Sequence, residues 1–279
     1  MLTLRNSHKM NKLIITDKGI IHSELRKETD LNKDKSVYEV LRVLDGTALF
    51  LEDHFNRLLS SVQMSGMNFK MNYSEFEHHI QELCTFNHQW VGNVKFVLSG
   101  DKMESSWSFS FIPHIYPSDA EYRDGVATGL LIAERANPNA KIIQQTVRDK
   151  ANQMMAEMKL YEVLLVDRNG LVTEGSRSNV FFVKGDRFYT APTAMVLAGV
   201  TRMKVLECLQ ELKFIVQEQA VASAEIGQYD AVFLTGTSPK VLPINRIDDQ
   251  RFKAGNPMVE QLRIKYNSMI ESYMASKKH

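Results

Sequence analysis

The sequence predicts an α/β protein, with mixed sheets of α+β character, that folds as two domains. Strand-like runs and amphipathic helix-like runs occur in both halves of the 279 residues. A stretch rich in turn residues, 116–125, separates the halves and is predicted to be a linker. We therefore expect a smaller N-terminal domain over 1–115 and a larger C-terminal domain over 126–279. A Rossmann sheet is not expected, because the chain contains no GxGxxG turn.

The N-terminal half is predicted to contain strands and two helices. Alternating apolar residues and turn signals predict a hairpin over 11–23 and strands at 37–44, 47–51, 91–99 and 106–113. A helix is predicted over 52–65, because apolar residues recur there at helical spacing and Gly66 can end it. Ser74, followed by Glu77 three residues later, predicts a capping box at the start of the second helix.

The C-terminal half is predicted to contain more strands and three helices. Strands are expected at 126–133, 161–166, 171–173, 179–183, 187–190 and 230–234. One helix is predicted over 147–158, and another follows Gly199. The second is expected to bury one stripe of apolar residues, Met203, Leu206, Leu209 and Leu212. Asn256, followed by Pro257, predicts the start of a terminal helix.

Composition and charge argue against several classes of protein. The formal net charge is +1, which gives no electrostatic reason to expect a nucleic acid or membrane partner. No apolar run approaches the ~18 residues that a membrane span requires. Cys84 and Cys208 lie far apart, so we expect neither a disulfide scaffold nor a metal site, and a cytoplasmic location. Residues 1–9 are either a poorly packed extension or precede a natural start at Met10.

Three motifs follow one another in the C-terminal half. They are Thr173-Glu174-Gly175-Ser176, then Leu197-Ala198-Gly199-Val200-Thr201-Arg202, and finally Phe233-Leu234-Thr235-Gly236-Thr237. Together they resemble the class IV (fold type IV) pyridoxal-phosphate (PLP) family. This family includes branched-chain aminotransferases, D-amino acid aminotransferases and aminodeoxychorismate lyases. The resemblance covers about residues 12–250 and implies a two-domain fold with the cofactor PLP between the domains.

Glu174 is the predicted partner of the cofactor ring nitrogen. When PLP is protonated there, its ring accepts the electrons released as a bond at the substrate Cα breaks, and an anion beside the nitrogen keeps the proton in place. Glu174 matches the acidic residue of the family motif. Taken alone, Glu174 would be interpreted as a glutamate of a turn that is exposed to solvent. The presence of the other two motifs favours the cofactor role instead.

Two backbone cradles and an arginine are predicted to bind the cofactor phosphate. Val200 and Thr201 open a helix, where unpaired N–H groups and the helix dipole favour an anion. Gly236 and Thr237 offer a second cradle at a strand end. Arg57 matches the phosphate-binding arginine of the family, whose planar fork suits bidentate contacts. The alternative for Arg57 is a surface ion pair with Asp53, four residues earlier.

Lys141 is predicted to bind the cofactor covalently. Lys150 is the other candidate before Glu174, but it lies among charged residues inside the predicted helix 147–158. Lys141 precedes that helix in a context of small residues. In the related enzymes the reactive lysine precedes a helix that leads into the next strand, and this order selects Lys141.

Tyr38 and Arg177 are the predicted substrate contacts. The family often has an aromatic residue at the position of Tyr38, although a core tyrosine is an equal alternative. No arginine lies between Arg57 and Arg123, where many of these transaminases place one for the substrate carboxylate. We therefore expect Arg177 to supply that charge, with Lys95 and Lys240 as other candidates and a solvent-facing Arg177 as the simpler alternative.

The resemblance implies a PLP-dependent aminotransferase that moves an amino group between an amino acid and a 2-oxo acid. The amino acid would be of the branched-chain or D-amino acid type. An aminodeoxychorismate lyase, which releases pyruvate and 4-aminobenzoate, is the alternative. A non-catalytic PLP-binding or scaffold protein is a minor alternative. A homodimer is also expected from the resemblance.

Overall fold

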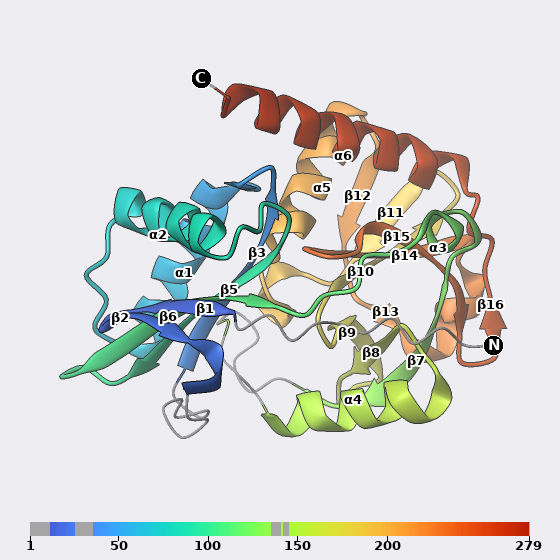
Figure 1. Ribbon diagram of the computed structural model, residues 1–279. Helices are drawn as coiled ribbons and strands as arrows, with labels where there is room; N and C mark the ends of the chain where they lie inside the picture. The colour runs from blue at the N-terminus through green and yellow to red at the C-terminus, as the bar shows by residue number, and fades with distance from the viewer. Residues whose placement is uncertain (1–11, 26–35, 135–140, 142–144, 279) are drawn as a thin grey trace, which may run out of the picture.

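The computed structural model describes residues 12–25, 36–134, 141 and 145–278. These residues form two β-sheets that lie side by side, each covered by helices (Figure 1). The predicted α/β architecture with mixed sheets is confirmed.

The N-terminal sheet has six strands in the order β2-β1-β6-β5-β3-β4, and all neighbouring pairs are antiparallel. The strands are β1 (Leu13–Thr16), β2 (Gly19–His22), β3 (Ser36–Leu44), β4 (Thr47–Ala48), β5 (Gly92–Gly100) and β6 (Ser105–Ile112). Helices α1 (Leu51–Ser65) and α2 (Tyr73–Phe86) cover one face. Large apolar side chains fill the space between, among them Phe55, Leu58, Phe76, Phe96 and Phe109. Residues on the other face of this sheet line the cavity described below.

The helix ends of this half show one prediction right and one wrong. Gly66 ends α1 as predicted, with a φ of 67° that a glycine adopts without strain. The capping box of α2 lies two residues before the predicted Ser74 and Glu77. Asn72 Oδ1 accepts from the N–H of Glu75 (3.0 Å), and Glu75 Oε2 accepts from the N–H of Asn72 (2.8 Å). Asn72 can cap because its backbone is extended, whereas Ser74 already lies inside the helix.

The C-terminal sheet has ten strands in the order β12-β11-β10-β14-β15-β7-β8-β9-β13, with β16 paired to β15. Strand β7 is parallel to β15 and β8, and β11 to β12, while the other pairs are antiparallel. The strands are β7 (Val126–Ile132), β8 (Glu162–Val166), β9 (Leu171–Gly175), β10 (Asn179–Lys184), β11 (Arg187–Thr190), β12 (Ile215–Glu218), β13 (Val221–Ala222), β14 (Ala231–Gly236), β15 (Lys240–Ile247) and β16 (Gln250–Arg251).

Helices cover the C-terminal sheet on both sides of the layer (Figure 1). Helices α5 (Val200–Glu211) and α6 (Pro257–Ser276) pack on a core that includes Phe181, Phe188 and Phe233. Helix α4 (Gln145–Met158) packs beside β7 and β8 through a smaller cluster around Ala151 and Val163. A short connection joins α4 to β8, and Glu162 at the start of β8 lines the cavity described below.

The apolar stripe predicted for α5 is right only in part. Leu209 is buried and Leu206 packs against the same core, but Met203 is 39% exposed. The buried residues of the helix are Val200, Thr201, Arg202, Val205, Cys208 and Leu209. Arg202 is buried because it donates to Ala191 O (3.0 Å) and to Glu218 Oε2 (2.8 Å). Because the charge of Arg202 is paired, this arginine can be buried at a position that the apolar pattern of the sequence places on the solvent-facing side of the helix.

The segment predicted as a linker contains a short helix, α3 (Asp119–Asp124), capped by a Ser118–Glu121 capping box. The hydroxyl of Tyr122 donates to Pro239 O (3.1 Å), which ties the segment to the C-terminal sheet. The boundaries at 115 and 126 stay a prediction.

None of the helices in the described residues combines the length and the apolar character needed to cross a membrane. In the same residues, no group of three or more His, Cys, Asp or Glu side chains is arranged to hold a metal ion. Burial raises the pKa of the Cys84 and Cys208 thiols to about 11, so both stay protonated at neutral pH.

Candidate cofactor and substrate site

A cavity of about 1000 Å³ lies between the two sheets, a size suited to a cofactor together with a small substrate. All nine predicted site residues line it: Tyr38, Arg57, Lys141, Glu174, Arg177, Val200, Thr201, Gly236 and Thr237. Neither Lys150 nor Lys240 lines it. The Nζ of Lys240 instead donates to Asn267 Oδ1 (3.3 Å), so this candidate for the substrate charge is not at the site.

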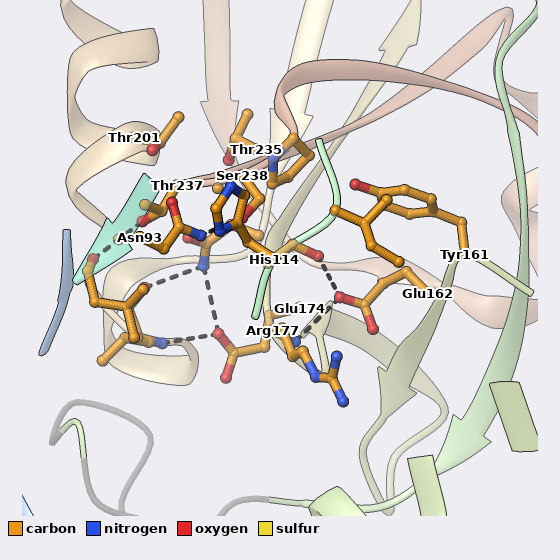
Figure 2. Close-up of a pocket in the computed structure, with 18 of the residues that line it drawn as sticks. Asn93, His114, Tyr161, Glu162, Glu174, Arg177, Thr201, Thr235, Thr237 and Ser238 are labelled. Atoms are coloured by element: carbon orange, nitrogen blue, oxygen red, sulfur yellow. Dashed lines mark hydrogen bonds between the residues drawn. The ribbon is translucent and has the colours of Figure 1, made fainter. Parts of the chain in front are cut away.

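Glu174 lies at the end of β9 and is only 3% exposed. Its Oε2 accepts from the N–H of Leu197 (3.1 Å) and from Asn179 Nδ2 (3.4 Å). Asn179 Nδ2 also donates to Leu197 O (3.0 Å), so these contacts fix the carboxylate in one position (Figure 2). The turn-glutamate alternative, which places Glu174 in solvent, is wrong.

Glu162 is a second buried carboxylate that sequence reasoning missed. It opens β8, is 4% exposed, and receives hydroxyl donors from Ser176 (2.6 Å) and Ser178 (2.9 Å). The N–H of Arg177 also donates to it (3.1 Å), so Glu162 fixes the whole turn after Glu174 (Figure 2). The available signal was an acidic residue at the start of an otherwise apolar strand.

Arg57 is held in the cavity wall by Glu39. Its Nε donates to Glu39 Oε1 (2.8 Å) and its Nη2 to Glu39 Oε2 (2.6 Å), a bidentate pair. The Nδ1 of His54 contacts the same carboxylate (2.9 Å). Asp53, the partner in the alternative for Arg57, pairs instead with Lys204 (3.1 Å). The surface-pair alternative is therefore wrong.

The ionisation of this pair follows from its surroundings. Burial alone would raise the pKa of Glu39, but the charge of Arg57 and the hydrogen bonds from His54 and Arg57 outweigh it and hold the pKa at about 2. Burial lowers the pKa of His54 below 6.5, against the opposing effect of Glu39, so its imidazole is neutral at pH 7. A negative Glu39 therefore orients Arg57, whose Nη1 reaches the carbonyl of Ala198 (3.2 Å).

Within the described residues, no side chain caps the N-terminus of α5, which lies at the cavity wall. Its N-cap, Gly199, has no side chain to bond the first N–H groups, which include those of Val200 and Thr201. A Cβ on Gly199 would lie 2.1 Å from Asn179 Oδ1, so a larger residue there would displace the Asn179 side chain. Across the cavity, the hydroxyl of Thr235 is buried and unbonded within the described residues.

Lys141 is tied to the N-terminal domain through its backbone. Its N–H donates to Ser61 Oγ (3.2 Å), and its carbonyl accepts from the N–H of Tyr38 (3.1 Å). Its Nζ lies 4.7 Å from the centroid of the Tyr38 ring. Lys150 is exposed on α4. The geometry therefore agrees with the choice of Lys141.

Tyr38 and Arg177 both contact residues of helix α4. Tyr38 is 4% exposed on β3, and its hydroxyl accepts from Arg148 Nη2 (2.8 Å), a residue that sequence reasoning missed. Arg177 is exposed, and its Nη2 contacts Asn152 Oδ1. Lys95 on β5 also lines the cavity.

The residues present fit PLP. A buried carboxylate, a lysine, an arginine and a helix N-terminus face one cavity, and the buried Thr235 hydroxyl lacks a partner there within the described residues. The family model for amino-transferase class IV matches residues 36–247. The chain belongs to the class IV aminotransferase family. Members of this family are enzymes that use PLP.

The chain is similar in sequence to named aminotransferases and in fold to solved structures. The chain is 29% identical to D-alanine aminotransferase of Bacillus licheniformis over 232 residues, 79% of this chain and 82% of that protein. It is 25% identical to the branched-chain-amino-acid aminotransferase of Pseudomonas aeruginosa, covering 86% and 85%. The Escherichia coli branched-chain amino acid aminotransferase superimposes with a TM-score of 0.82 at 17% identity, over 93% of this chain and 95% of that one.

A protein of Legionella pneumophila, named as a 4-amino-4-deoxychorismate lyase, shares the fold as well. Its TM-score is 0.78 at 20% identity, over 89% of this chain and 97% of that one. Proteins named for transamination and for lyase activity therefore share this architecture, and the fold does not choose between the two activities.

Proposed function

We propose that this protein is an aminotransferase that moves an amino group between an amino acid, of the branched-chain or D-amino acid type, and a 2-oxo acid. The observation that carries the proposal is that Lys141, Glu174 and Arg57 line one cavity with the N-terminus of α5. Sequence similarity to proteins named as D-alanine and branched-chain aminotransferases supports the reaction type.

Each residue has a distinct role in this proposal. When bound, PLP supplies the sink for the electrons released at the substrate Cα. Lys141 holds the cofactor covalently and moves the proton at that carbon. Glu174 keeps the ring nitrogen protonated, because its buried negative charge favours a proton beside it. Arg57 binds the phosphate.

The backbone donors complete the phosphate site. The N–H groups of Val200 and Thr201, at the start of α5, would bind the cofactor phosphate together with Arg57, because a helix N-terminus favours an anion. Gly236 ends β14 and Thr237 follows it at the cavity wall, and together they form the second cradle. The hydroxyl of Thr237 reaches Val40 O (3.3 Å), so this cradle also joins the two sheets.

Arg177 binds the substrate carboxylate in this proposal. It lines the cavity, and the bond from its N–H to Glu162 fixes its backbone beside the Glu174 carboxylate. Strand β5 offers Lys95 and no arginine. A charge-assisted bidentate contact contributes roughly 1.5–3 kcal/mol, so Arg177→Ala should weaken substrate binding on the order of tenfold to a hundredfold.

The lyase activity is a second candidate, favoured by one observation. The arginine that many transaminases use near β5 is missing from this chain. A lyase uses the same lysine and cofactor but releases pyruvate from aminodeoxychorismate without exchanging amino groups.

One panel of substrates, assayed with the wild type and with Arg177→Ala, tests the proposal. It contains D-alanine, L-leucine and L-glutamate with 2-oxo acids, and aminodeoxychorismate. We expect amino transfer with the amino acids and a raised KM in the variant. Pyruvate from aminodeoxychorismate alone would establish the lyase. An unchanged KM for the amino acid substrates in Arg177→Ala would show that Arg177 does not bind the substrate carboxylate.

Binding of the cofactor is tested before turnover. We expect the purified protein to be yellow, with a visible band that borohydride abolishes by reducing the link between lysine and cofactor. A colourless protein that takes up no PLP on incubation would overturn the proposed function.

A further inference from the structure

The last turns of helix α6 reach the start of helix α1 in the other half of the chain (Figure 1). The hydroxyl of Tyr273 donates to Glu52 Oε2 (2.8 Å), and Lys277 Nζ contacts the same carboxylate. The hydroxyl also accepts from the backbone N–H of Leu51 (3.1 Å), the first residue of α1. One tyrosine of α6 therefore binds the start of α1 both as a donor and as an acceptor.

Helix α1 begins at a residue that cannot cap it. Its N-cap is Phe50, whose side chain has no hydrogen-bond acceptor, whereas a typical N-cap residue offers an oxygen to one of the first N–H groups. The N–H of Leu51 is one of these groups, and Leu51 is only 2% exposed, so losing its acceptor would leave a buried donor unbonded. Tyr273 therefore supplies from α6 the cap that the sequence of α1 lacks.

Leu49 and Phe50, directly before α1, are buried in the core of the C-terminal half. Both are 5% exposed and pack in the cluster that contains residues of α5 and α6. The ring of Phe50 lies 5.0 Å from that of Tyr273, measured between centroids. Lys204 of α5 adds an ion pair with Asp53 of α1 (3.1 Å). The first turn of α1 is thus fixed against α5 and α6.

The charge of Glu52 sets the direction of the hydrogen bonds at Tyr273. Burial alone would raise the pKa of Glu52, but its hydrogen bonds, chiefly the one from Lys277, outweigh this effect and hold the pKa at about 2. An ionised carboxylate only accepts, so the Tyr273 hydroxyl donates to it and turns its oxygen to the N–H of Leu51. The Glu52 side chain is 45% exposed, and water competes for it, so the bond to Leu51 contributes more to the coupling.

Arg57 lies in the second turn of α1, and its place relative to the other half depends on how that helix is held. Its Nη1 donates to Ala198 O (3.2 Å), beside Gly199, the N-cap of α5. Glu39 holds the guanidinium within the N-terminal half, and this pair does not set the distance to α5. Because a helix moves as a rigid element, fixing the first turn of α1 against α6 fixes the position of Arg57 relative to α5.

We propose that Tyr273 is a positioning residue for the cofactor phosphate, because it caps α1 from α6 and so holds Arg57 beside the N-terminus of α5. The inference rests on the proposed function, in which Arg57 and the start of α5 bind the phosphate of PLP. Tyr273 does not line the cavity, so it acts through α1 without touching the cofactor. Its removal should weaken binding of the phosphate in particular.

Hydrogen exchange tests the cap without any cofactor. We expect Tyr273→Phe to speed the exchange of the Leu51 N–H by about tenfold or more, because this donor loses its acceptor while the ring stays in place. Tyr229→Phe makes the same substitution in a different core cluster, away from the cavity, and should leave this exchange unchanged. NMR of the isotope-labelled full chain measures both variants.

Affinity for two forms of the cofactor tests the link to the phosphate. PLP and pyridoxal differ by the phosphate alone, and fluorescence titration measures the Kd of each. We expect Tyr273→Phe to weaken PLP binding by roughly threefold to tenfold, the contribution of about one hydrogen bond, and to leave pyridoxal binding unchanged. Tyr229→Phe should bind both like the wild type.

A double-mutant cycle with Arg57→Gln shows whether the effect passes through Arg57. In that background the effect of Tyr273→Phe on PLP affinity should disappear, because the group that Tyr273 positions is gone. The comparison of PLP with pyridoxal needs no variant of Arg57, so it decides the question where Arg57→Gln does not fold.

Three results would overturn the inference. The first is an unchanged exchange rate of the Leu51 N–H in Tyr273→Phe. The second is an unchanged affinity of this variant for PLP. The third is an equal loss of affinity for PLP and pyridoxal, or with and without Arg57, because this would mean a general loss of structure. A wild type that takes up no PLP would overturn the proposed function and, with it, the link to the phosphate, whereas the exchange rate tests the cap in either case.

Discussion

At the scale of single residues, the site depends on buried carboxylates that hold cations and donors in place. Glu39 fixes Arg57 through two hydrogen bonds, and Glu162 fixes the turn that carries Arg177. Neither glutamate was predicted from the sequence. Each acts through the residue that it orients, so both are positioning residues.

Glu39→Gln should destabilise the protein in a pH-dependent way. Removing one partner of a buried ion pair costs roughly 3–5 kcal/mol, because the guanidinium of Arg57 stays buried without its countercharge. The pKa of Glu39 is depressed from 4.5 to about 2, so its contribution to stability is fully present above about pH 4.5 and is lost as the pH falls toward 2. Urea unfolding of both proteins from pH 7 to pH 3 measures this. A difference in stability that stays constant with pH would contradict the ion pair.

Lys141→Ala should abolish the visible band and lower turnover by roughly a hundredfold to ten-thousandfold, because the amine both binds the cofactor and moves a proton. PLP should still bind without a covalent link, as equilibrium dialysis would show. Lys150→Ala is the matched control and should keep the band. The assignment is wrong if the two variants behave the other way round.

At the scale of secondary-structure elements, helix α5 brings its N-terminus to the cavity without a capping side chain. Gly199→Ala should weaken PLP binding by about tenfold or more, because the new Cβ would lie 2.1 Å from Asn179 Oδ1 and displace the side chain that bonds Glu174. Fluorescence titration measures the affinity. Gly255→Ala, where a Cβ meets nothing within 4 Å, should bind PLP normally. Equal affinities would show that α5 is not the phosphate cradle.

The start of α2 gives a prediction about stability alone. Asn72→Ala should cost about 1 kcal/mol, because the N–H of Glu75 loses its acceptor. Ser74→Ala, two residues later, should change the free energy of unfolding by less than about 0.5 kcal/mol. Thermal unfolding measures both variants, and transaminase assays should show unchanged activity. A larger loss of stability in Ser74→Ala than in Asn72→Ala would instead support the capping box predicted from the sequence.

At the scale of the whole molecule, we expect a homodimer whose cavity is completed by the second copy. Ile115 lines the cavity and yet is 82% exposed, and Met103 is 89% exposed. Large apolar side chains with this exposure favour an interface. Light scattering should give twice the mass of one chain, and activity should fall on dilution as the dimer dissociates. A fully active monomer would contradict this prediction.

Much of the fold followed from local patterns, and the errors have physical causes. Gly66 was placed correctly because a glycine after an apolar helix is a local signal. Met203 was wrongly placed on the buried face of α5, because its neighbour Arg202 is buried there by contacts with Ala191 and Glu218, which lie outside the helix. The resemblance to the family selected nine residues that line the cavity, and their roles stay predictions, whereas Glu39 and Arg148 were missed because no motif contains them.

The sequence by itself determined the family, the cofactor and nine of the residues that line the cavity, because motifs of neighbouring residues carry that information. The tertiary structure alone decided which charges are paired. Arg57 meets Glu39 across 18 residues, and Arg148 meets Tyr38 across 110. A charge interacts through space and burial, not along the chain, so only the folded sheets show which cations are neutralised and which face a substrate.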